Sequence, residues 1–150
     1  MPTLATNKKA FFDYSVVERY EAGIVLSGQE VKSVRQGHMS LKGSFAVFKG
    51  AELYLIHVHI SPYPQAGKIS SYDPEHSRKL LLKKKELGHL IGLLKQKGLT
   101  LVPLSVYTHT NRIKIELGLC RGKQQYEKRE KIKKQDIERE IRSVLKRKGT

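Results

Sequence analysis

Apolar and polar positions alternate in short runs along most of the chain, a pattern more typical of β-strands than of helices. Residues 14–26 are rich in β-branched and aromatic side chains and predict a strand. Residues 44–48 and 52–60 predict a first hairpin, and residues 100–107 and 112–119 predict a second one. We therefore expect about six short strands, joined largely by hairpins.

Two segments instead carry apolar residues at helical spacing. Residues 30–36 predict a short helix, because Val31 and Val34 are three positions apart and share one helical face. Residues 75–97 predict a long helix, because leucines recur along it at roughly helical spacing. An Asp-Pro pair just before this segment supplies an N-cap and a first helical residue.

The balance of these elements indicates a fold class. Short strands outnumber helices, and hairpin connections make neighbouring strands antiparallel. A sheet that closes on itself has no exposed edge, as in the OB fold. We therefore expect a mainly β protein with helices: a small antiparallel OB-type β-barrel of about six strands, with one short and one long flanking helix.

The pattern changes near the C-terminal end. In residues 122–134, Ile132 is the one strongly apolar side chain, which is too little to offset the entropy cost of ordering the chain. A narrow apolar stripe at helical spacing follows in residues 137–145. We expect a barrel domain over residues 1–121 and a basic tail over residues 122–150. The tail should be disordered when free and helical only on a surface that neutralises its charge.

Charge narrows the class of partner. The chain carries 29 Lys and Arg against 14 Asp and Glu, a formal net charge of +15, and its sequence pI is close to 10.0. Basic residues are densest in residues 121–150, which hold 12 of them. This distribution indicates a polyanionic partner, most often a nucleic acid. An anionic membrane is the competing partner, but the tail has no Trp or Phe to insert into lipid.

Other features exclude several classes of protein. The single cysteine, Cys120, can form neither an internal disulfide framework nor a cysteine zinc site. No apolar run approaches the roughly 18–20 residues of a membrane helix. Residues 1–13 lack the apolar region of a secretory signal. We therefore expect a soluble, cytoplasmic protein.

Catalytic chemistry has little support. His57 and His59 are two positions apart on a predicted strand and share a face, as paired metal ligands can, but such residues are more often ordinary strand residues. Asp13, Glu21 and Glu30 offer carboxylates for a magnesium-dependent nuclease. Neither set has the spacing of a dedicated catalytic motif. We expect no enzyme, no catalytic residue, no metal site and no cofactor.

Nucleic-acid binding has more support. Lys32 and Arg35 are three positions apart on the predicted short helix and present two cations for contacts with phosphate. The lysine run at residues 83–85 is better interpreted as a solvated helix face. Tyr126 lies among cations after the last predicted strand. Its ring either stacks on an unpaired base or folds back on the barrel, and the residues alone leave both open.

Several motifs, taken in order along the chain, match one family. They are NKKA at residues 7–10, DY at 13–14, YEAGI at 20–24, GQEVKSVR at 28–35, DP at 73–74 with RKLLL at 78–82, KGLTLVPL at 97–104, and GK at 122–123 with YEKR at 126–129. Together they resemble the bacterial tmRNA-binding proteins, a family also called SsrA-binding protein or small protein B. The match extends from about residue 7 to about residue 145.

The resemblance implies a non-catalytic adaptor of trans-translation, the rescue of ribosomes stalled on messages without a stop codon. It implies an OB-type barrel that binds the tRNA-like domain of tmRNA and stands in for the anticodon arm that this RNA lacks. It also implies delivery of alanyl-tmRNA with elongation factor Tu and GTP, and a tail that becomes helical in the decoding centre and empty mRNA channel. A structural ribosomal-type RNA-binding protein is the alternative, against which the ordered motifs argue. We expect the free chain to be a monomer.

The resemblance also implies site residues. Glu21, Lys32 and Arg35 match positions on or near the surface that faces tmRNA. Arg78 and Lys79 fall in another matching motif and either contact tmRNA or support the structure. The carboxylate of Glu21 would accept hydrogen bonds from base edges or 2′-hydroxyls, or orient an arginine. The tail residues that match the ribosome-binding segment are Lys123, Tyr126, Lys128, Arg129, Lys131, Lys133 and Lys134.

Overall fold

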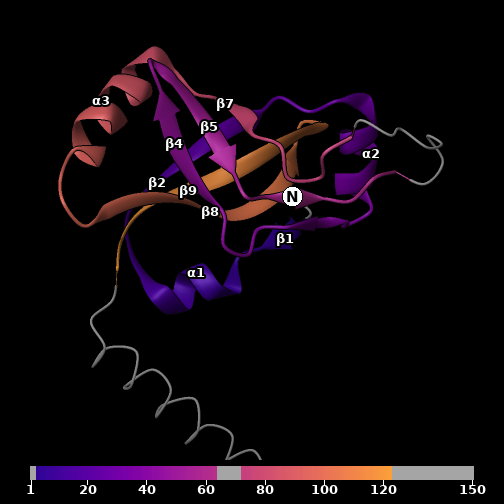
Figure 1. Cartoon of the computed structure of the whole chain (residues 1–150), viewed down its shortest axis with the longest axis horizontal. Coiled ribbons are helices and arrows are strands. Elements are labelled where there is room, and N and C mark those ends of the chain that lie inside the picture. The colour runs from indigo at the N-terminus through magenta and orange to yellow at the C-terminus, as the bar shows by residue number, and fades with distance from the viewer. Residues whose placement is uncertain (1–2, 64–71, 123–150) are drawn as a thin grey trace, which may run out of the picture.

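Six antiparallel strands form a closed ring in the computed structural model, which describes residues 3–63 and 72–122 (Figure 1). Around the ring the order is β8, β4, β5, β7, β2 and β9, and β9 pairs back with β8. This closure confirms the prediction of a small antiparallel fold with about six strands. The ring strands are β2 (Tyr14–Ile24), β4 (Phe45–Lys49), β5 (Glu52–Ile56), β7 (Arg78–Leu81), β8 (Leu99–His109) and β9 (Arg112–Gly122).

The ring is irregular, because its strands pair over very different lengths. The β8–β9 ladder runs from the Leu99–Arg121 pair to the His109–Arg112 pair. In contrast, β4 meets β8 at the single pair of Ala46 with Leu101. The long strands β2, β9 and β8 therefore form a continuous curved sheet, and the shorter strands complete the closure.

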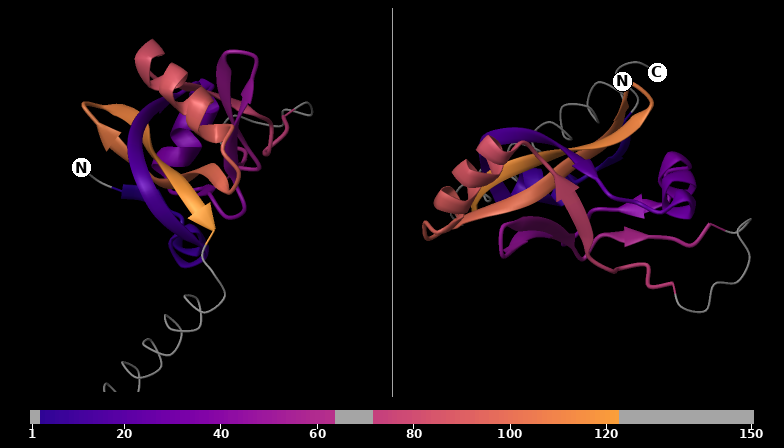
Figure 2. Two further views of the ribbon diagram at one scale, coloured as in Figure 1. Left: turned by 90° about the vertical axis from the view of Figure 1, so that its left-hand side faces the viewer. Right: turned by 90° about the horizontal axis from the view of Figure 1, so that it is seen from above.

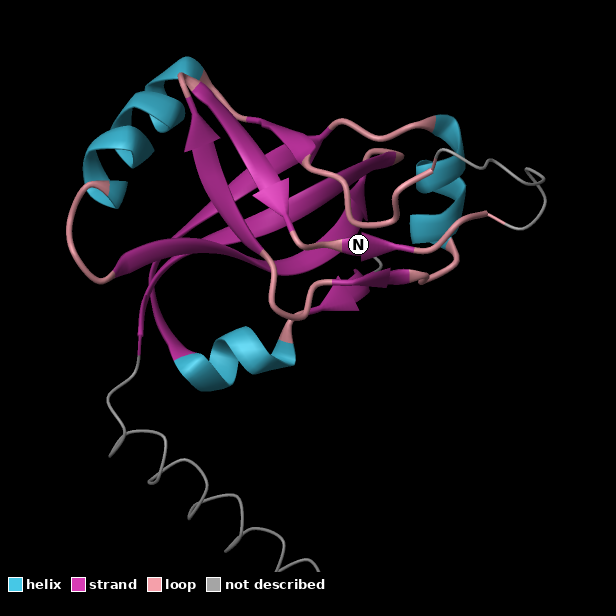
Figure 3. Cartoon of the chain, in the orientation of Figure 1, coloured by secondary structure: helices cyan, strands magenta, loops and turns pink. Residues whose placement is uncertain are grey.

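The remaining described elements surround this ring (Figure 3). Strand β1 (Thr3–Thr6) pairs with β8, and β3 (Met39–Ser40) pairs with β6 (His59–Ile60) in a separate small sheet. Helices α2 (Gly28–Arg35) and α3 (Lys84–Leu94) lie at opposite ends of the ring (Figure 2), and α1 (Lys8–Asp13) precedes β2. None of the helices in residues 3–63 and 72–122 has the length and apolar character needed to cross a lipid bilayer.

The hydrophobic core fills the interior of the ring. Leu53, Leu55, Leu101, Ile115 and Leu117 are all fully buried. Along β9, inward residues alternate with outward polar ones from position 112 to position 116, because successive side chains of a strand point to opposite faces. The same alternation leaves a row of polar side chains on the outer face of the long strands.

The β8–β9 hairpin confirms the strands predicted at residues 100–107 and 112–119. Its two strands meet at Thr110 and Asn111, whose φ angles are 49° and 61°. Positive φ at two consecutive central residues is the geometry of a type I′ turn, whose twist suits a tight hairpin.

The short helix is also confirmed, although α2 begins two residues before the predicted start. Ser27 is its N-cap, and a capping box joins the Ser27 and Glu30 side chains to each other's backbone N–H groups. Val34 is fully buried in the core, and Val31 packs against it. The predicted valine face is therefore the one that anchors α2.

The prediction of one helix over residues 75–97 is wrong at its N-terminal end. Residues 78–81 form strand β7, in which Arg78 and Leu80 point inward while Lys79 and Leu81 point outward. The helix α3 begins only at Lys84. Alternation with period two therefore prevails here over the helical spacing of the leucines, because Leu80 belongs to the core of the ring.

Asp73 does not cap a helix either. Its Oδ1 accepts a hydrogen bond from the Glu75 backbone N–H at 2.9 Å, a contact that forms a local turn. The N-cap position of α3 is Lys83, which makes no side-chain capping bond.

The predicted strand over residues 52–60 is interrupted. Strand β5 ends at Ile56, His57 has a φ of 63°, and the chain pairs again only at His59 in β6. His57 and His59 are therefore not successive same-face residues of one strand.

The structure adds α1 and β1, which the sequence pattern did not predict. Asn7, 5% exposed, caps α1 by accepting from the Ala10 N–H, and its Nδ2 donates to the Pro103 carbonyl at 2.9 Å. Almost all of the predicted tail lies outside the described residues. Gly122, the first residue assigned to that tail, is the last residue of β9.

Candidate nucleic-acid interface

A shallow groove crosses the outer face of the ring at Gly23. This residue of β2 pairs with Leu81 of β7 on one side and with Lys114 of β9 on the other. A Cβ atom at Gly23 would lie 3.4 Å from the Leu81 Cβ and 3.8 Å from the Lys114 Nζ. Because glycine has no side chain, the space between leucine and lysine stays open. We call this hollow the Gly23 groove and define it by Gly23, Leu81 and Lys114.

The Gly23 groove continues in two directions. Toward α2 it is also lined by Arg35 and Arg112, and toward α3 by Glu21, Lys83 and Glu86. Cations therefore lie along most of its length, and carboxylates lie at one end. Such a distribution suits an RNA strand, which presents phosphates, hydroxyls and bases together.

Leu81 gives the groove an apolar wall. Its side chain is unusual for a large hydrophobic residue because it is 51% exposed to solvent. The alternation of β7 turns it outward, while its neighbour Leu80 enters the core. An exposed leucine beside a lysine offers a surface for the face of a sugar or base, with a cation close enough for a phosphate.

Glu21 is held at the edge of the groove by β8. The Tyr107 hydroxyl donates to its Oε2 at 2.6 Å, and the His109 Nδ1 lies 3.4 Å from its Oε1. The hydrogen bond from Tyr107, aided by His109 and Lys114, lowers the pKa of Glu21 below its ordinary value, although slight burial opposes this. Glu21 is therefore ionised at neutral pH.

Tyr107 keeps its proton in this arrangement. Burial, the hydrogen bond to Glu21 and nearby carboxylates raise the pKa of Tyr107 above its ordinary value. The Glu21 side chain is 43% exposed, so its remaining lone pairs are open to a donor from a partner. Among the described residues its hydrogen-bonding neighbours are a tyrosine and a histidine rather than an arginine. This favours direct acceptance from RNA over the orientation of an arginine.

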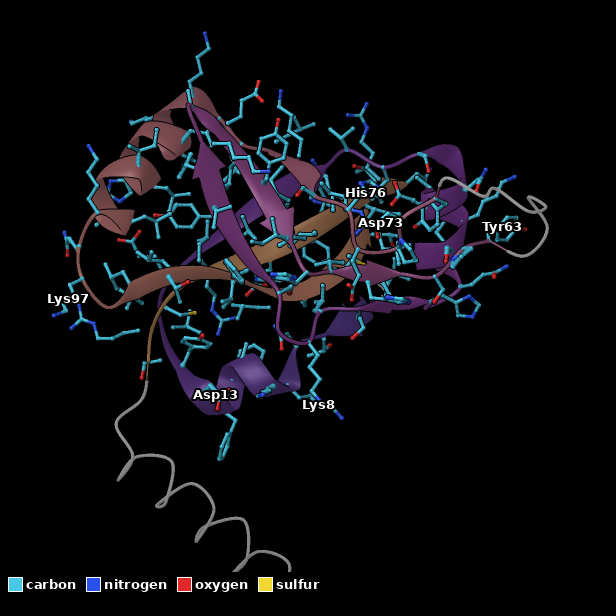
Figure 4. The ribbon with its side chains drawn as sticks, viewed as in Figure 1. Lys8, Asp13, Tyr63, Asp73, His76 and Lys97 are labelled. Atoms are coloured by element: carbon cyan, nitrogen blue, oxygen red, sulfur yellow. The ribbon has the colours of Figure 1, made fainter. Side chains whose placement is uncertain are left out.

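The two cations of α2 face different neighbours. Arg35 Nη2 donates to the Asn111 carbonyl at 2.8 Å, at the tip of the β8–β9 hairpin, and so lines the groove. Lys32 Nζ lies 5.5 Å from the centre of the Tyr63 ring, at the α2 end of the molecule (Figure 4). The structure therefore brings Glu21 and Arg35 to one groove and leaves Lys32 on an exposed part of α2, outside the residues that line that groove.

Arg78, predicted either to contact tmRNA or to support the structure, lies in the interior of the fold. Its side chain is 0% exposed. Its guanidinium donates to Glu30 Oε2 at 2.7 Å and 3.0 Å, and to the carbonyls of Val58 at 2.7 Å and Pro74 at 2.8 Å. The alternative, that this residue supports the structure, agrees with these contacts.

Lys79 lies outside the groove. It points outward from β7, and its Nζ is 3.1 Å from Glu52 Oε1 in an exposed ion pair. Its paired neighbour is Tyr54 of β5. Lys79 therefore belongs to the adjacent outer surface, and its predicted contact with RNA stays a prediction.

Other predicted sites are less informative. The seven tail residues predicted to bind the ribosome all lie outside the described residues. Within residues 3–63 and 72–122, no three side chains of the metal-ligating types gather into a group that could hold an ion. Cys120 is buried, and this burial raises the pKa of its thiol to about 11, so the thiol is unreactive at neutral pH.

Gly23, Leu81 and Lys114 were not predicted as site residues. One signal was present for Lys114, because Arg112, Lys114 and Glu116 alternate with isoleucines and so share an outward face. No such signal existed for Leu81, since its exposure depends on β7 being a strand.

A small closed antiparallel sheet with a cation-lined groove on its outer face is typical of compact β-fold nucleic-acid-binding proteins. Residues 4–147 match the family described as SmpB protein. The chain therefore belongs to the SmpB, or SsrA-binding protein, family, which is a family of RNA-binding proteins rather than enzymes.

Individual relatives are similar along almost the whole chain. An SsrA-binding protein of Coxiella burnetii (strain Dugway 5J108-111) is 50% identical over 147 residues, covering 98% of this chain and 92% of that protein. One from Chloroflexus aggregans is 51% identical over 144 residues, covering 96% and 91%. A chain of the solved structure "tmRNA-SmpB: a journey to the center of the bacterial ribosome" is 48% identical, has a TM-score of 0.68, and covers 83% of this chain and 87% of its own.

Proposed function

We propose that this chain binds the tRNA-like domain of tmRNA through the Gly23 groove and the adjacent cations of α2. The observation that carries the proposal is the groove itself, in which exposed Leu81 lies between cations on the outer face of a closed sheet. A sheet holds its side chains in fixed positions, so a folded RNA can be recognised by shape as well as by charge. Membership of the SsrA-binding protein family supports this choice of RNA.

On this proposal the chain is a cytoplasmic adaptor of trans-translation. It stands in for the missing anticodon arm of tmRNA and, with elongation factor Tu and GTP, delivers alanyl-tmRNA to stalled ribosomes as a monomer. Residues 123–150 supply the contacts with the decoding centre and the empty mRNA channel. The similarity to a chain of the solved structure "tmRNA-SmpB: a journey to the center of the bacterial ribosome" supports tmRNA and the ribosome as the partners.

A charge reversal tests the groove. Changing Arg35→Glu and Lys114→Glu together should weaken binding of the full chain to the tRNA-like domain by about a hundredfold or more, since two hydrogen-bonding cations are lost. The slope of log affinity against log salt should become shallower by about 2, because fewer counterions are released. The matched control is Lys49→Glu with Lys95→Glu, which makes the same charge change at two exposed lysines outside the groove. If the control weakens binding as much as the groove variant does, net charge rather than the groove is responsible.

A truncation tests the division of labour. Deleting residues 123–150 should leave the affinity for the tRNA-like domain within about threefold of the full chain, because the groove remains. The same deletion should abolish peptide tagging on stalled ribosomes. Loss of tmRNA binding by the truncated chain would show that the tail, not the folded part, holds the RNA.

The alternative function, a structural ribosomal-type RNA-binding protein, is distinguished by the number of copies per purified ribosome. An adaptor is present at far less than one copy per purified ribosome, and its share rises when ribosomes stall. A constant share of one copy per ribosome would instead favour the structural protein.

A further inference from the structure

A buried ion pair lies beneath α2 and has no part in the groove surface. Glu30 and Arg78 are 3% and 1% exposed, although they are 48 residues apart in sequence. Both Nε and Nη2 of Arg78 donate to Glu30 Oε2, at 3.0 Å and 2.7 Å. The other oxygen, Oε1, accepts the backbone N–H of Ser27 at 3.1 Å and so completes the cap of α2. One carboxylate thus joins the start of a helix to a strand of the ring.

Arg78 extends this connection to two further segments. Its Nη1 donates to the Val58 carbonyl between β5 and β6, and its Nη2 donates to the Pro74 carbonyl just before β7. His76, in the same segment as Pro74, places its Nε2 3.0 Å from Glu30 Oε2. The pair therefore fixes α2, the β5–β6 connection and the approach to β7 relative to one another.

Net stability is a weak explanation for this arrangement. Removing two charges from water is costly, and apolar pairs of similar volume often replace buried ion pairs without loss of stability. The pair does stay ionised, because although burial alone would raise the pKa of Glu30, hydrogen bonds from Ser27 and Arg78 lower it. An arginine fork fixes the relative orientation of the segments it joins, because several hydrogen bonds at fixed angles permit one orientation. An apolar pair does not fix this orientation.

The orientation of α2 matters at the groove. Val31, the residue after Glu30, and Arg35, one turn later, both line the part of the groove nearest α2. Arg35 also bonds to Asn111 of the β8–β9 hairpin. A rotation or shift of α2 would therefore move the Arg35 guanidinium away from the place where the groove can use it.

We propose that Glu30 and Arg78 are positioning residues for RNA recognition: they hold α2 so that Arg35 lies over one end of the Gly23 groove. This inference rests on the proposed function, because it concerns the same RNA interface. It assigns Arg78 an indirect role in RNA binding through Arg35, in place of direct contact.

A double-mutant cycle on the full-length chain tests the inference. Arg78→Lys keeps the positive charge beside Glu30 but replaces a five-donor fork by a single ammonium group, which cannot reach Glu30, Val58 and Pro74 together. Arg35→Ala removes the groove cation. Affinity for the tRNA-like domain of tmRNA is measured for the four combinations, at a temperature where thermal unfolding shows each variant to be folded. Glu30→Gln, which keeps the shape of the side chain, replaces Arg78→Lys in a second cycle.

The inference predicts that the two positions are coupled. Arg35→Ala should weaken binding about tenfold in the wild-type chain, as expected for loss of one charged hydrogen bond. In the Arg78→Lys or Glu30→Gln chain it should weaken binding by about twofold or less, because Arg35 is already misplaced. The matched control is Leu90→Ala, which disturbs the fully buried core side of α3 at the far end of the ring (Figure 2). In that background Arg35→Ala should still cost about tenfold.

Each other result has a distinct meaning. If Arg35→Ala costs the same in the Arg78→Lys and Glu30→Gln chains as in the wild type, Glu30 and Arg78 are purely structural and the inference is overturned. If Arg35→Ala has no effect in the wild type while Lys114→Glu does, α2 lies outside the interface, so the inference fails and the proposed function stands. If neither change weakens binding, the proposed groove fails, and the positioning role fails with it.

Discussion

Glu21 and Glu30 are two carboxylates on the same small fold, and their surroundings give them different tasks. Glu30 is 3% exposed and accepts hydrogen bonds from Ser27 and Arg78, with His76 and Tyr72 also within reach. Glu21 is bonded mainly by Tyr107 and remains open to solvent. Both have a lowered pKa. The oxygens of the buried carboxylate accept hydrogen bonds from groups inside the protein, whereas those of the exposed carboxylate remain partly open to donors from a partner.

The comparison implies that folding and direct contact with RNA depend on separate residues. The buried pair and the core should control the free energy of unfolding, and the groove should make the direct RNA contacts, in which the buried pair takes part only by positioning Arg35. Substitutions matched in chemistry but different in location can separate the two quantities.

The largest expected effect is on folding. Arg78→Ala leaves the Glu30 carboxylate buried without its partner, and removal of one member of a buried pair costs about 3–5 kcal/mol. Denaturant unfolding of Arg78→Ala and of Glu21→Ala measures the contrast, since Glu21→Ala should change the free energy of unfolding only slightly. Equal destabilisation by the two changes would contradict the comparison.

Two glycines on the long strands offer a smaller and sharper contrast. A Cβ at Gly118 would lie 2.8 Å from the Leu104 Cδ1, so Gly118→Ala should destabilise the fold by about 1–3 kcal/mol through overpacking. A Cβ at Gly23 meets its nearest atom at 3.4 Å, an ordinary contact. Gly23→Ala should therefore leave the thermal unfolding temperature almost unchanged but weaken RNA binding by partly filling the groove. An unaltered affinity would remove Gly23 from the interface.

A smaller effect is expected in acid. Because the pKa of Glu30 in the folded state is lowered from 4.5, its ionised form adds stability above that pH. This contribution is lost progressively as pH falls below 4.5 and through the lower folded value. The free energy of unfolding, measured from pH 7 to pH 2, should therefore fall less steeply for Glu30→Gln than for the wild type below about pH 5. If the two curves of unfolding free energy against pH ran parallel, the partners of Glu30 would not be lowering its pKa.

The smallest effect is expected at the exposed pair of Lys79 and Glu52. Such surface pairs contribute little, because water screens the charges and ordering two long side chains costs entropy. Lys79→Ala should change neither the unfolding temperature nor the affinity for the tRNA-like domain beyond experimental error. A clear loss of RNA affinity would extend the interface beyond the Gly23 groove to the outer face of β5 and β7.

Local patterns in the sequence predict much of the ring. The strands β2, β8 and β9 follow from alternation of apolar residues, and α2 follows from Val31 and Val34. The region around Arg78 was wrongly predicted because one inward position of β7 is occupied by an arginine. A sequence pattern counts arginine as an outward, polar residue unless its buried partner is known. That partner, Glu30, is 48 residues away. No local pattern reveals such a pair.

The candidate site is harder to predict for the same reason. Gly23, Leu81 and Lys114 meet only through the register of three strands that are distant in sequence. The family motifs pointed to Glu21 and Arg35, which the structure places at the groove. They also pointed to Arg78, which the structure places beneath α2.

The most direct test of the central claim is an NMR titration of the isotope-labelled full chain with the tRNA-like domain of tmRNA. The account predicts that backbone amide signals of Gly23, Leu81 and Lys114 shift or broaden first, while those of β4 and β5 change little. Changes confined to β4 and β5, or to residues 123–150, with the groove signals unmoved, would contradict it.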